Sequence, residues 1–247
     1  MSVLAAERIK LLTTRSPWWC TAIALVLSVG LASLIAYGSN QTGPEGQTFE
    51  LTVSGTQAGG VLLGLSVIMI MATLAVTTEY RFGVIRTTFQ ATPGRSTVLL
   101  TKALLLGVVA AVIGEVIAFG SLLVARLVRG GGLPLATSAD WRATAGLGLV
   151  YGLAAVLAVA VGALLRQSAG AVALLLLFPL AVENLVQLIP RIGDDLHTWM
   201  PFVNANRFLD QAPVGDTLGP WGSLGYFAVV VAVVLGLALV VVNRRDA

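Results

Sequence analysis

The sequence predicts an all-α membrane protein with six transmembrane helices and both chain ends on the cytoplasmic side. Of the 247 residues, 57% are hydrophobic and only 11% are charged, whereas soluble domains carry about 25% charged residues. A helix needs about 20 mostly apolar residues to cross the ~30 Å hydrocarbon core of a bilayer. Six stretches meet that length: Trp18–Tyr37, Gly59–Thr77, Val98–Arg126, Ala143–Leu165, Ala169–Ile189 and Trp221–Val242.

The segments between these stretches are too short to form a soluble domain, because the longest holds about 30 residues and a domain needs about 50 or more. We therefore predict one membrane domain over residues 1–247. A secretory signal is the competing interpretation of the first stretch, which follows several basic residues. Its apolar part exceeds the usual length of about 7–15 residues and has no small-residue cleavage site after it, so we expect a retained span.

The distribution of basic residues predicts the orientation. With both chain ends inside, ten of the fifteen Lys and Arg residues fall on the cytoplasmic side, which is the side that short basic loops prefer. The remaining five are Arg126, Arg129, Arg142, Arg191 and Arg207. The net charge of +3 then reflects orientation, so we expect contact with membrane lipids and no nucleic-acid partner. The expected location is the inner (cytoplasmic) membrane.

The segment before the first span, Ser2–Ser16, mixes Leu and Ile with Glu7, Lys10 and Arg15. This pattern predicts a short amphipathic helix in the inner membrane interface. Pro17 is expected to end it. The alternative is a disordered basic tail.

The loop between the second and third spans also carries a helical pattern. Phe82, Ile85 and Phe89 recur at i, i+3 and i+7 and so share one face, with Arg86 on another. We expect a short helix at the membrane surface that docks a soluble partner. An ordinary solvated basic loop is the alternative.

The order of several short motifs resembles the six-span permeases of ABC type-2 transporters, of the actinobacterial type. No single motif is specific, but their joint order is, and the resemblance covers the whole chain in length, span count and loop placement. The motifs are Ala6-Glu7-x-x-Lys10-Leu11, Glu79-Tyr-Arg-x-Gly83, Ile85-Arg86-Thr87-Thr88, Pro93-x-Arg95 with Lys102, and the turn Leu165–Gly170. One departure is Val84, where family members often carry a small polar residue.

The resemblance implies an exporter subunit for a hydrophobic or amphiphilic substrate. ATP and Mg would be bound by a separate ATPase, present in two copies, and a second permease chain would complete the path. This chain contains no G-x-x-x-x-G-K-[ST] pattern for binding nucleotide. The implied coupling helix comprises Glu79, Arg81, Phe82, Gly83, Ile85, Arg86 and Phe89. The implied N-terminal connecting helix carries Glu7, Lys10 and Arg15.

Two carboxylates, Glu115 and Glu183, lie inside predicted spans, where a charge costs a few kcal/mol or more unless it is paired, solvated or protonated. Glu183, with Pro179 and Gln187 one turn to either side, could line the outer part of a translocation path or could make a buried hydrogen bond. For Glu115 we favour a structural role.

Two other function classes stay open. A proton-coupled secondary transporter would use Glu115 and Glu183 as its relay. A membrane-embedded enzyme would need a nucleophile with a base, a metal cluster or paired carboxylates, and a chain with one His and one Cys gives little support for that. We expect no cofactor or metal in this chain. The last outer loop, Pro190–Pro220, contains aromatic residues that predict a short re-entrant or interfacial helix.

Overall fold

The computed structural model describes residues 3–41, 50–85, 94–211 and 218–244, and every regular element within these ranges is helical. Six helices are long and apolar enough to cross a membrane, which confirms the predicted number of spans. In chain order the elements are α1 (Val3–Thr13), α2 (Arg15–Ser39), α3 (Val53–Thr56), the π-helical turn η1 (Gly60–Gly64), α4 (Leu65–Arg81), α6 (Arg95–Arg129), α7 (Ser138–Leu165), α8 (Ser168–Leu177), the π-helical turn η2 (Phe178–Val182), α9 (Glu183–Val186), α10 (Gly193–Thr198), α11 (Pro201–Phe208) and α12 (Pro220–Arg244).

Two predicted boundaries were wrong. The second span continues to Arg81, so Glu79 and Arg81 lie on α4 and not in the following loop. The N-terminal helix ends at Thr13, and Pro17 lies in the first turn of α2. Proline is tolerated there because the first backbone N–H groups of a helix have no intrahelical partner.

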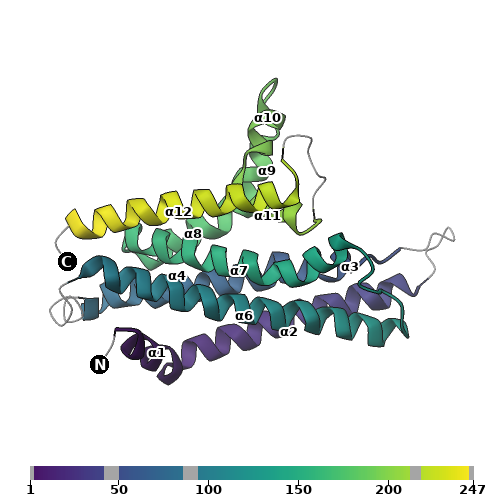
Figure 1. The fold of residues 1–247 in the computed structure, drawn as a ribbon, viewed down its shortest axis with the longest axis horizontal. Helices are drawn as coiled ribbons and strands as arrows, with labels where there is room; N and C mark the ends of the chain where they lie inside the picture. Colours follow the sequence, from purple (N-terminus) through teal and green to yellow (C-terminus); the bar gives the residue numbers. More distant parts are fainter. Residues whose placement is uncertain (1–2, 42–49, 86–93, 212–217, 245–247) are drawn as a thin grey trace.

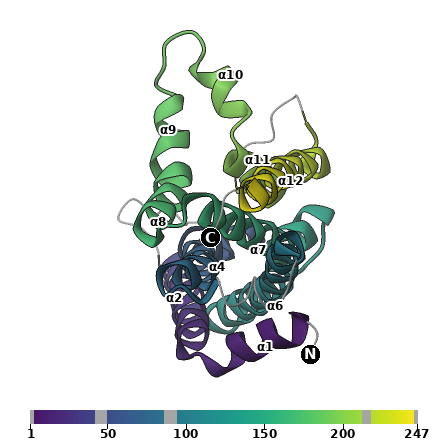
Figure 2. The ribbon, with the colours of Figure 1, turned by 90° about the vertical axis from the view of Figure 1, so that its left-hand side faces the viewer.

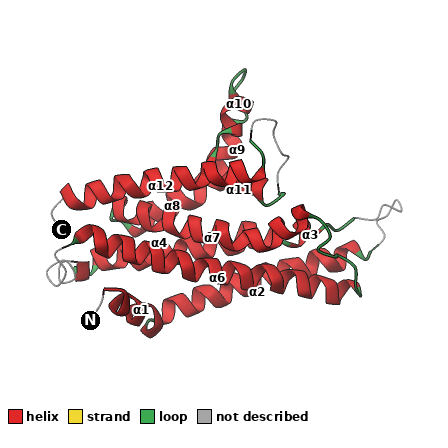
Figure 3. Ribbon diagram, in the orientation of Figure 1, coloured by secondary structure: helices red, strands yellow, loops and turns green. Residues whose placement is uncertain are grey.

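The long helices run along a common axis, and both chain ends lie at the same end of the bundle (Figure 1). We call this the terminus end and the opposite one the far end. Figure 3 shows the same arrangement by secondary structure, with α1 beside the terminus end of the bundle. Because the six spans alternate in direction, the first span begins and the last span ends at the same end of the bundle.

The centre of the bundle is α7, which packs against α4, α6 and α12. Small residues make this close packing possible: a Cβ atom placed on Gly114 of α6 would lie 2.9 Å from the Cα atom of Gly148 on α7. Farther along α7, the Tyr151 hydroxyl donates to the carbonyl of Gly60 in η1 over 2.7 Å. Small residues thus bring the helix backbones together inside this chain.

The fifth span leaves the bundle before it reaches the far end. It consists of α8, η2 and α9, and Pro179 in η2 lacks the N–H group that a regular helix would use. After η2 the chain turns away from the bundle, and α9 and α10 form a hairpin that projects sideways (Figure 2). The chain returns through α11, whose Phe202 packs on Phe227 of α12 with ring centroids 5.4 Å apart.

Candidate functional site

Four charged side chains meet at the terminus end, and we call them the four-charge cluster: Glu7, Lys10, Glu79 and Lys102. The Lys10 ammonium lies 2.7 Å from Glu7 Oε1 and 2.9 Å from Glu79 Oε1. The Lys102 ammonium pairs with Glu7 Oε2 and lies 2.9 Å from Glu79 Oε1. The cluster therefore joins α1 to the end of α4 and to the start of α6.

The cluster is largely buried, because Glu7, Glu79 and Lys102 are each less than 9% exposed. Burial alone would raise the pKa of Glu7, but the Lys102 charge and the hydrogen bonds from both lysines outweigh it and hold that pKa below its usual value. Burial likewise opposes the charged form of Lys10, yet hydrogen bonds to Glu7 and Glu79 raise its pKa. Every contact within the cluster is between a lysine ammonium and a carboxylate oxygen.

A cavity of about 430 Å³ lies beside the cluster, between α1, the start of α2, α4 and α6. Apart from the four charges, its walls are mostly apolar, with Leu11, Met71 and Leu106 among the lining residues. Its volume falls in the range of small-molecule sites. The Lys10–Glu79 pair crosses from α1 to α4 beside this cavity, and the Lys102–Glu79 pair crosses from α6 to α4.

The turn after α4 presents an aromatic side chain at the terminus end. Phe82 follows the last residue of α4 and is 71% exposed, and the Arg81 guanidinium lies 5.7 Å from its ring centroid. Gly83 has φ of 70°, in the left-handed region that favours glycine. The helical face predicted from Phe82 onward is therefore interrupted at Gly83. Ile85, the next member of that face, is buried, while Phe89 and the neighbouring Arg86 lie outside the described residues.

The N-terminal residues named by the sequence divide between two helices. Glu7 and Lys10 lie on α1 and belong to the four-charge cluster, but Arg15 is the first residue of α2. Sequence reasoning about site residues missed Lys102. Lys102 could have been found as a lysine two turns into an apolar span, because an unpaired charge is costly there.

On the other side of the bundle, Glu183 has a capping role. Its carboxylate is 2% exposed and accepts hydrogen bonds from the backbone N–H groups of Phe202 at 2.9 Å and Val203 at 3.0 Å. These are N–H groups in the first turn of α11, which have no partner within the helix. Lining of a path by Glu183 stays a prediction, and in this conformation both carboxylate oxygens are engaged with α11.

A second cavity, of about 290 Å³, lies between the second and fifth spans. Its walls include Pro179 at the bend of the fifth span and the polar side chains of Ser66, Asn184 and Asn206. Gln187, the third residue named by the sequence for a path, is exposed beyond α9. The structure thus brings Pro179 to a cavity with three polar side chains and places Gln187 away from it.

Glu115 faces the α6–α7 contact. A Cβ atom on Gly148 would collide with its Oε1 atom, so the carboxylate occupies the space that the glycine leaves. Within the described ranges, Glu115 has no hydrogen bond or ion pair. The same ranges contain no group of three or more His, Cys, Asp and Glu residues that could hold a metal ion.

No protein-family model matches this sequence, and no curated protein matches it. The resemblance to ABC type-2 permeases therefore stays a prediction from the motifs.

Proposed function

We propose that this chain is the membrane-spanning permease subunit of an ATP-driven ABC exporter. The single observation that carries the proposal is the four-charge cluster. It connects α1, the helix expected at the membrane interface, to the ends of two spans through pairs of lysine ammonium and carboxylate groups. Such a connection transmits movement of a surface element into the bilayer, which an energy-coupled transporter requires.

In this proposal the terminus end faces the cytoplasm and binds an ATPase subunit. Exposed Phe82 and the neighbouring Arg81 lie at that end, within the segment that the family resemblance assigns to the coupling helix. A solvent-exposed aromatic residue with a flanking arginine is typical of the centre of a protein interface. ATP and Mg would be bound by the ATPase alone, and this chain would not be an enzyme.

The translocation path would form between two permease chains, identical or related. The fifth span offers a large unpartnered surface, including Leu174 and Leu177. The cavity lined by Pro179, Ser66 and Asn184 lies between this span and the second one. An apolar wall with a few polar groups suits a hydrophobic or amphiphilic substrate, including a drug-like molecule or a lipid.

The proposal is tested by isolating the chain with its partner from mildly crosslinked membranes. We expect a captured protein whose own sequence contains the G-x-x-x-x-G-K-[ST] pattern. Phe82→Ala, and separately Arg86→Glu combined with Phe89→Ala, should reduce its recovery at least about tenfold, in line with the loss of a central interface residue. The matched control is Trp141→Ala, which removes the ring of an aromatic residue that is 52% exposed at the far end and should leave recovery unchanged.

Two results would contradict the proposal: capture of no nucleotide-binding protein, or a captured ATPase whose recovery is the same for the Phe82 and Trp141 variants. The first removes the transporter class, and the second removes the docking surface.

A proton-coupled secondary transporter is the second candidate, favoured by the unpaired carboxylate of Glu115. In vesicles, a proton gradient without ATP would then drive transport, and Glu115→Gln would abolish it. The exporter proposal expects transport only with ATP inside the compartment that the terminus end faces, and little effect of Glu115→Gln.

A further inference from the structure

The hairpin formed by residues 184–199, which we call the arm, leaves the bundle at an angle to every long helix. It rises along α9 and returns along α10, and the two views show that it stands clear of the rest of the chain (Figures 1 and 2). Of its sixteen positions, only Gly193 is buried. The arm therefore gains little apolar burial from its own chain.

The arm is nevertheless built as a tight hairpin. The backbone N–H of Gly193 donates to the carbonyl of Ile189 over 2.9 Å. A Cβ atom on Gly193 would lie 2.6 Å from the carbonyl oxygen of Gln187, so only glycine lets the two limbs approach this closely. Arg191 at the tip has φ of 74°, in the left-handed region. The two limbs of the arm are therefore held close together in one defined turn.

Buried polar groups hold the base of the arm. Glu183 begins the outgoing limb and caps α11. On the returning limb, the Thr198 carbonyl accepts hydrogen bonds from Asn204 Nδ2 and Arg207, both at 2.9 Å. The hydroxyl of Tyr226 on α12 donates to the Trp199 carbonyl over 2.7 Å. These contacts join both limbs to α11 and α12, so the direction of the arm is fixed by the fold.

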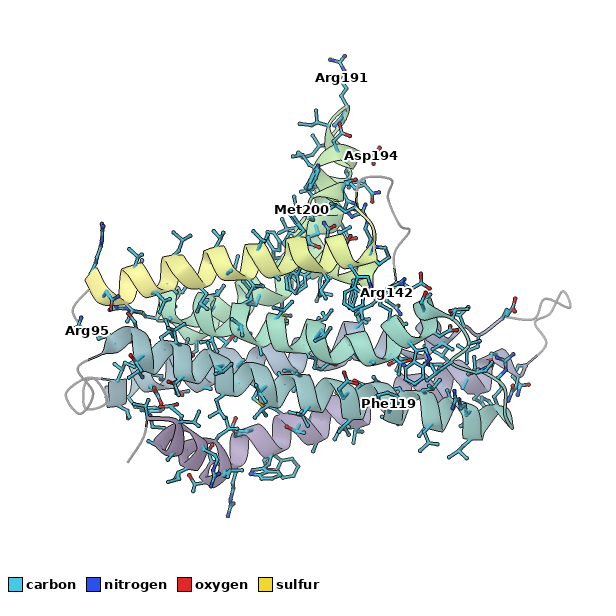
Figure 4. All side chains as sticks on the ribbon, viewed as in Figure 1. Arg95, Phe119, Arg142, Arg191, Asp194 and Met200 are labelled. Carbon is cyan, nitrogen blue, oxygen red and sulfur yellow. The ribbon has the colours of Figure 1, made fainter. Side chains whose placement is uncertain are left out.

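The surface of the arm is amphipathic. Its exposed apolar side chains are Leu185, Leu188, Ile189, Ile192 and Leu196, and Leu188 is 75% exposed. Arg191 points away from the bundle at the tip, and Asp194 points toward the far end (Figure 4). Apolar and charged groups in one short hairpin suit neither bulk water nor the hydrocarbon core.

The position of the arm along the bundle matches a membrane surface. Trp199 contacts the Tyr226 ring with centroids 5.6 Å apart. Tyr226 lies six residues after the start of α12, which is about 9 Å at ~1.5 Å per residue. Since α12 spans roughly 37 Å and the hydrocarbon core is ~30 Å thick, Tyr226 and Trp199 fall near the boundary between acyl chains and headgroups, where Trp and Tyr gather.

We propose that the arm is an interfacial anchor that lies along the membrane surface on the far side of the bundle. Its apolar side chains enter the acyl-chain boundary of that leaflet, while Asp194 faces water. The arm would therefore hold α11 and the outer end of α12 at a fixed depth. This role does not depend on what the protein transports.

The test uses a Cys20→Ser background, because Cys20 is the sole cysteine of the chain. Leu188→Cys, Ile192→Cys and Asp194→Cys are each labelled with an environment-sensitive fluorophore, and the protein is reconstituted at low density in phosphatidylcholine vesicles. Val233→Cys on α12, which is exposed in mid-span, is the matched control for a deep position.

The labels at Leu188 and Ile192 should emit at shorter wavelength than the label at Asp194. Lipids brominated near the carbonyl should quench them more strongly than lipids brominated at mid-chain. The control at Val233 should show the opposite order, and the label at Asp194 should be quenched by aqueous iodide. Quenching of the Leu188 label by iodide alone would place the arm in water and overturn the proposal. Protection from all quenchers, with crosslinking of Leu188→Cys between two chains, would also overturn it by placing the arm on a second copy.

Discussion

At the terminus end, Glu7 and Glu79 are neutralised by two lysine side chains that come from different helices, whereas Glu183 is held by two backbone N–H groups of α11. Pairs of long side chains can separate and form again when helices move. A carboxylate bound to the first turn of a helix keeps that turn in place. We therefore expect that movement enters the molecule around α1 and that the region near α11 stays fixed.

The largest effect is expected for the cluster. Lys102→Ala leaves Glu7 and Glu79 buried with one cation fewer, so the free energy of unfolding should fall by about 3–5 kcal/mol. The free energy of unfolding can be measured from SDS-induced unfolding in mixed micelles. Glu7→Gln combined with Lys102→Met should recover part of the loss, because the cluster then keeps the Glu79–Lys10 pair. Equal losses for the single and the combined variants would show that Glu7 and Lys102 do not act together.

A smaller loss is expected at Glu183. Glu183→Gln replaces one acceptor oxygen by an amide donor that faces a backbone N–H, so the free energy of unfolding should fall by roughly 1.5–3 kcal/mol. The exposed carboxylate of Asp194 provides the control, since Asp194→Asn should change it by no more than about 0.5 kcal/mol. Normal stability of Glu183→Gln together with lost transport would reverse the comparison and assign Glu183 to the path.

Gly148→Ala tests the contact between α6 and α7, which lies between the four-charge cluster and the region of Glu183. The new methyl group would lie 2.8 Å from the Ala111 carbonyl oxygen and against the Glu115 carboxylate. We expect a loss of about 1–3 kcal/mol from overpacking. Gly236→Ala on α12, where nothing lies within 4 Å of the added atom, is the control. A neutral Gly148→Ala would mean that the two helices are not closely packed in the membrane.

The smallest effect concerns pH. Because the pKa of Glu7 is lowered in the folded protein, its contribution to stability is complete above its unfolded pKa of about 4.3. That contribution is lost as the pH falls below this value and through the folded pKa. Between about pH 6 and about pH 3, the wild type should therefore lose more stability than Glu7→Gln. Parallel curves for the two proteins would show that Glu7 is not charged in the cluster.

Hydropathy predicted the six spans because each span needs enough apolar residues of its own to cross the hydrocarbon core. The sequence also pointed to Glu7, Lys10 and Glu79. It did not show that these residues meet each other and Lys102, because the paired residues are far apart in the chain: Lys10 and Glu79 are 69 positions apart, and Glu7 and Lys102 are 95 positions apart. The capping role of Glu183 depends on how the chain folds back through α11, which no local pattern encodes. The bend at η2 could not be predicted either, because a span can contain a proline and still stay within its bundle.

The account depends most on the terminus end facing the cytoplasm and contacting an ATPase. The most direct measurement is labelling of Phe82→Cys and Arg191→Cys, each in the Cys20→Ser background, with a membrane-impermeant maleimide. In intact cells only the Arg191 variant should react, and in inside-out vesicles only the Phe82 variant should react. Labelling of the Phe82 variant from outside intact cells would contradict the account.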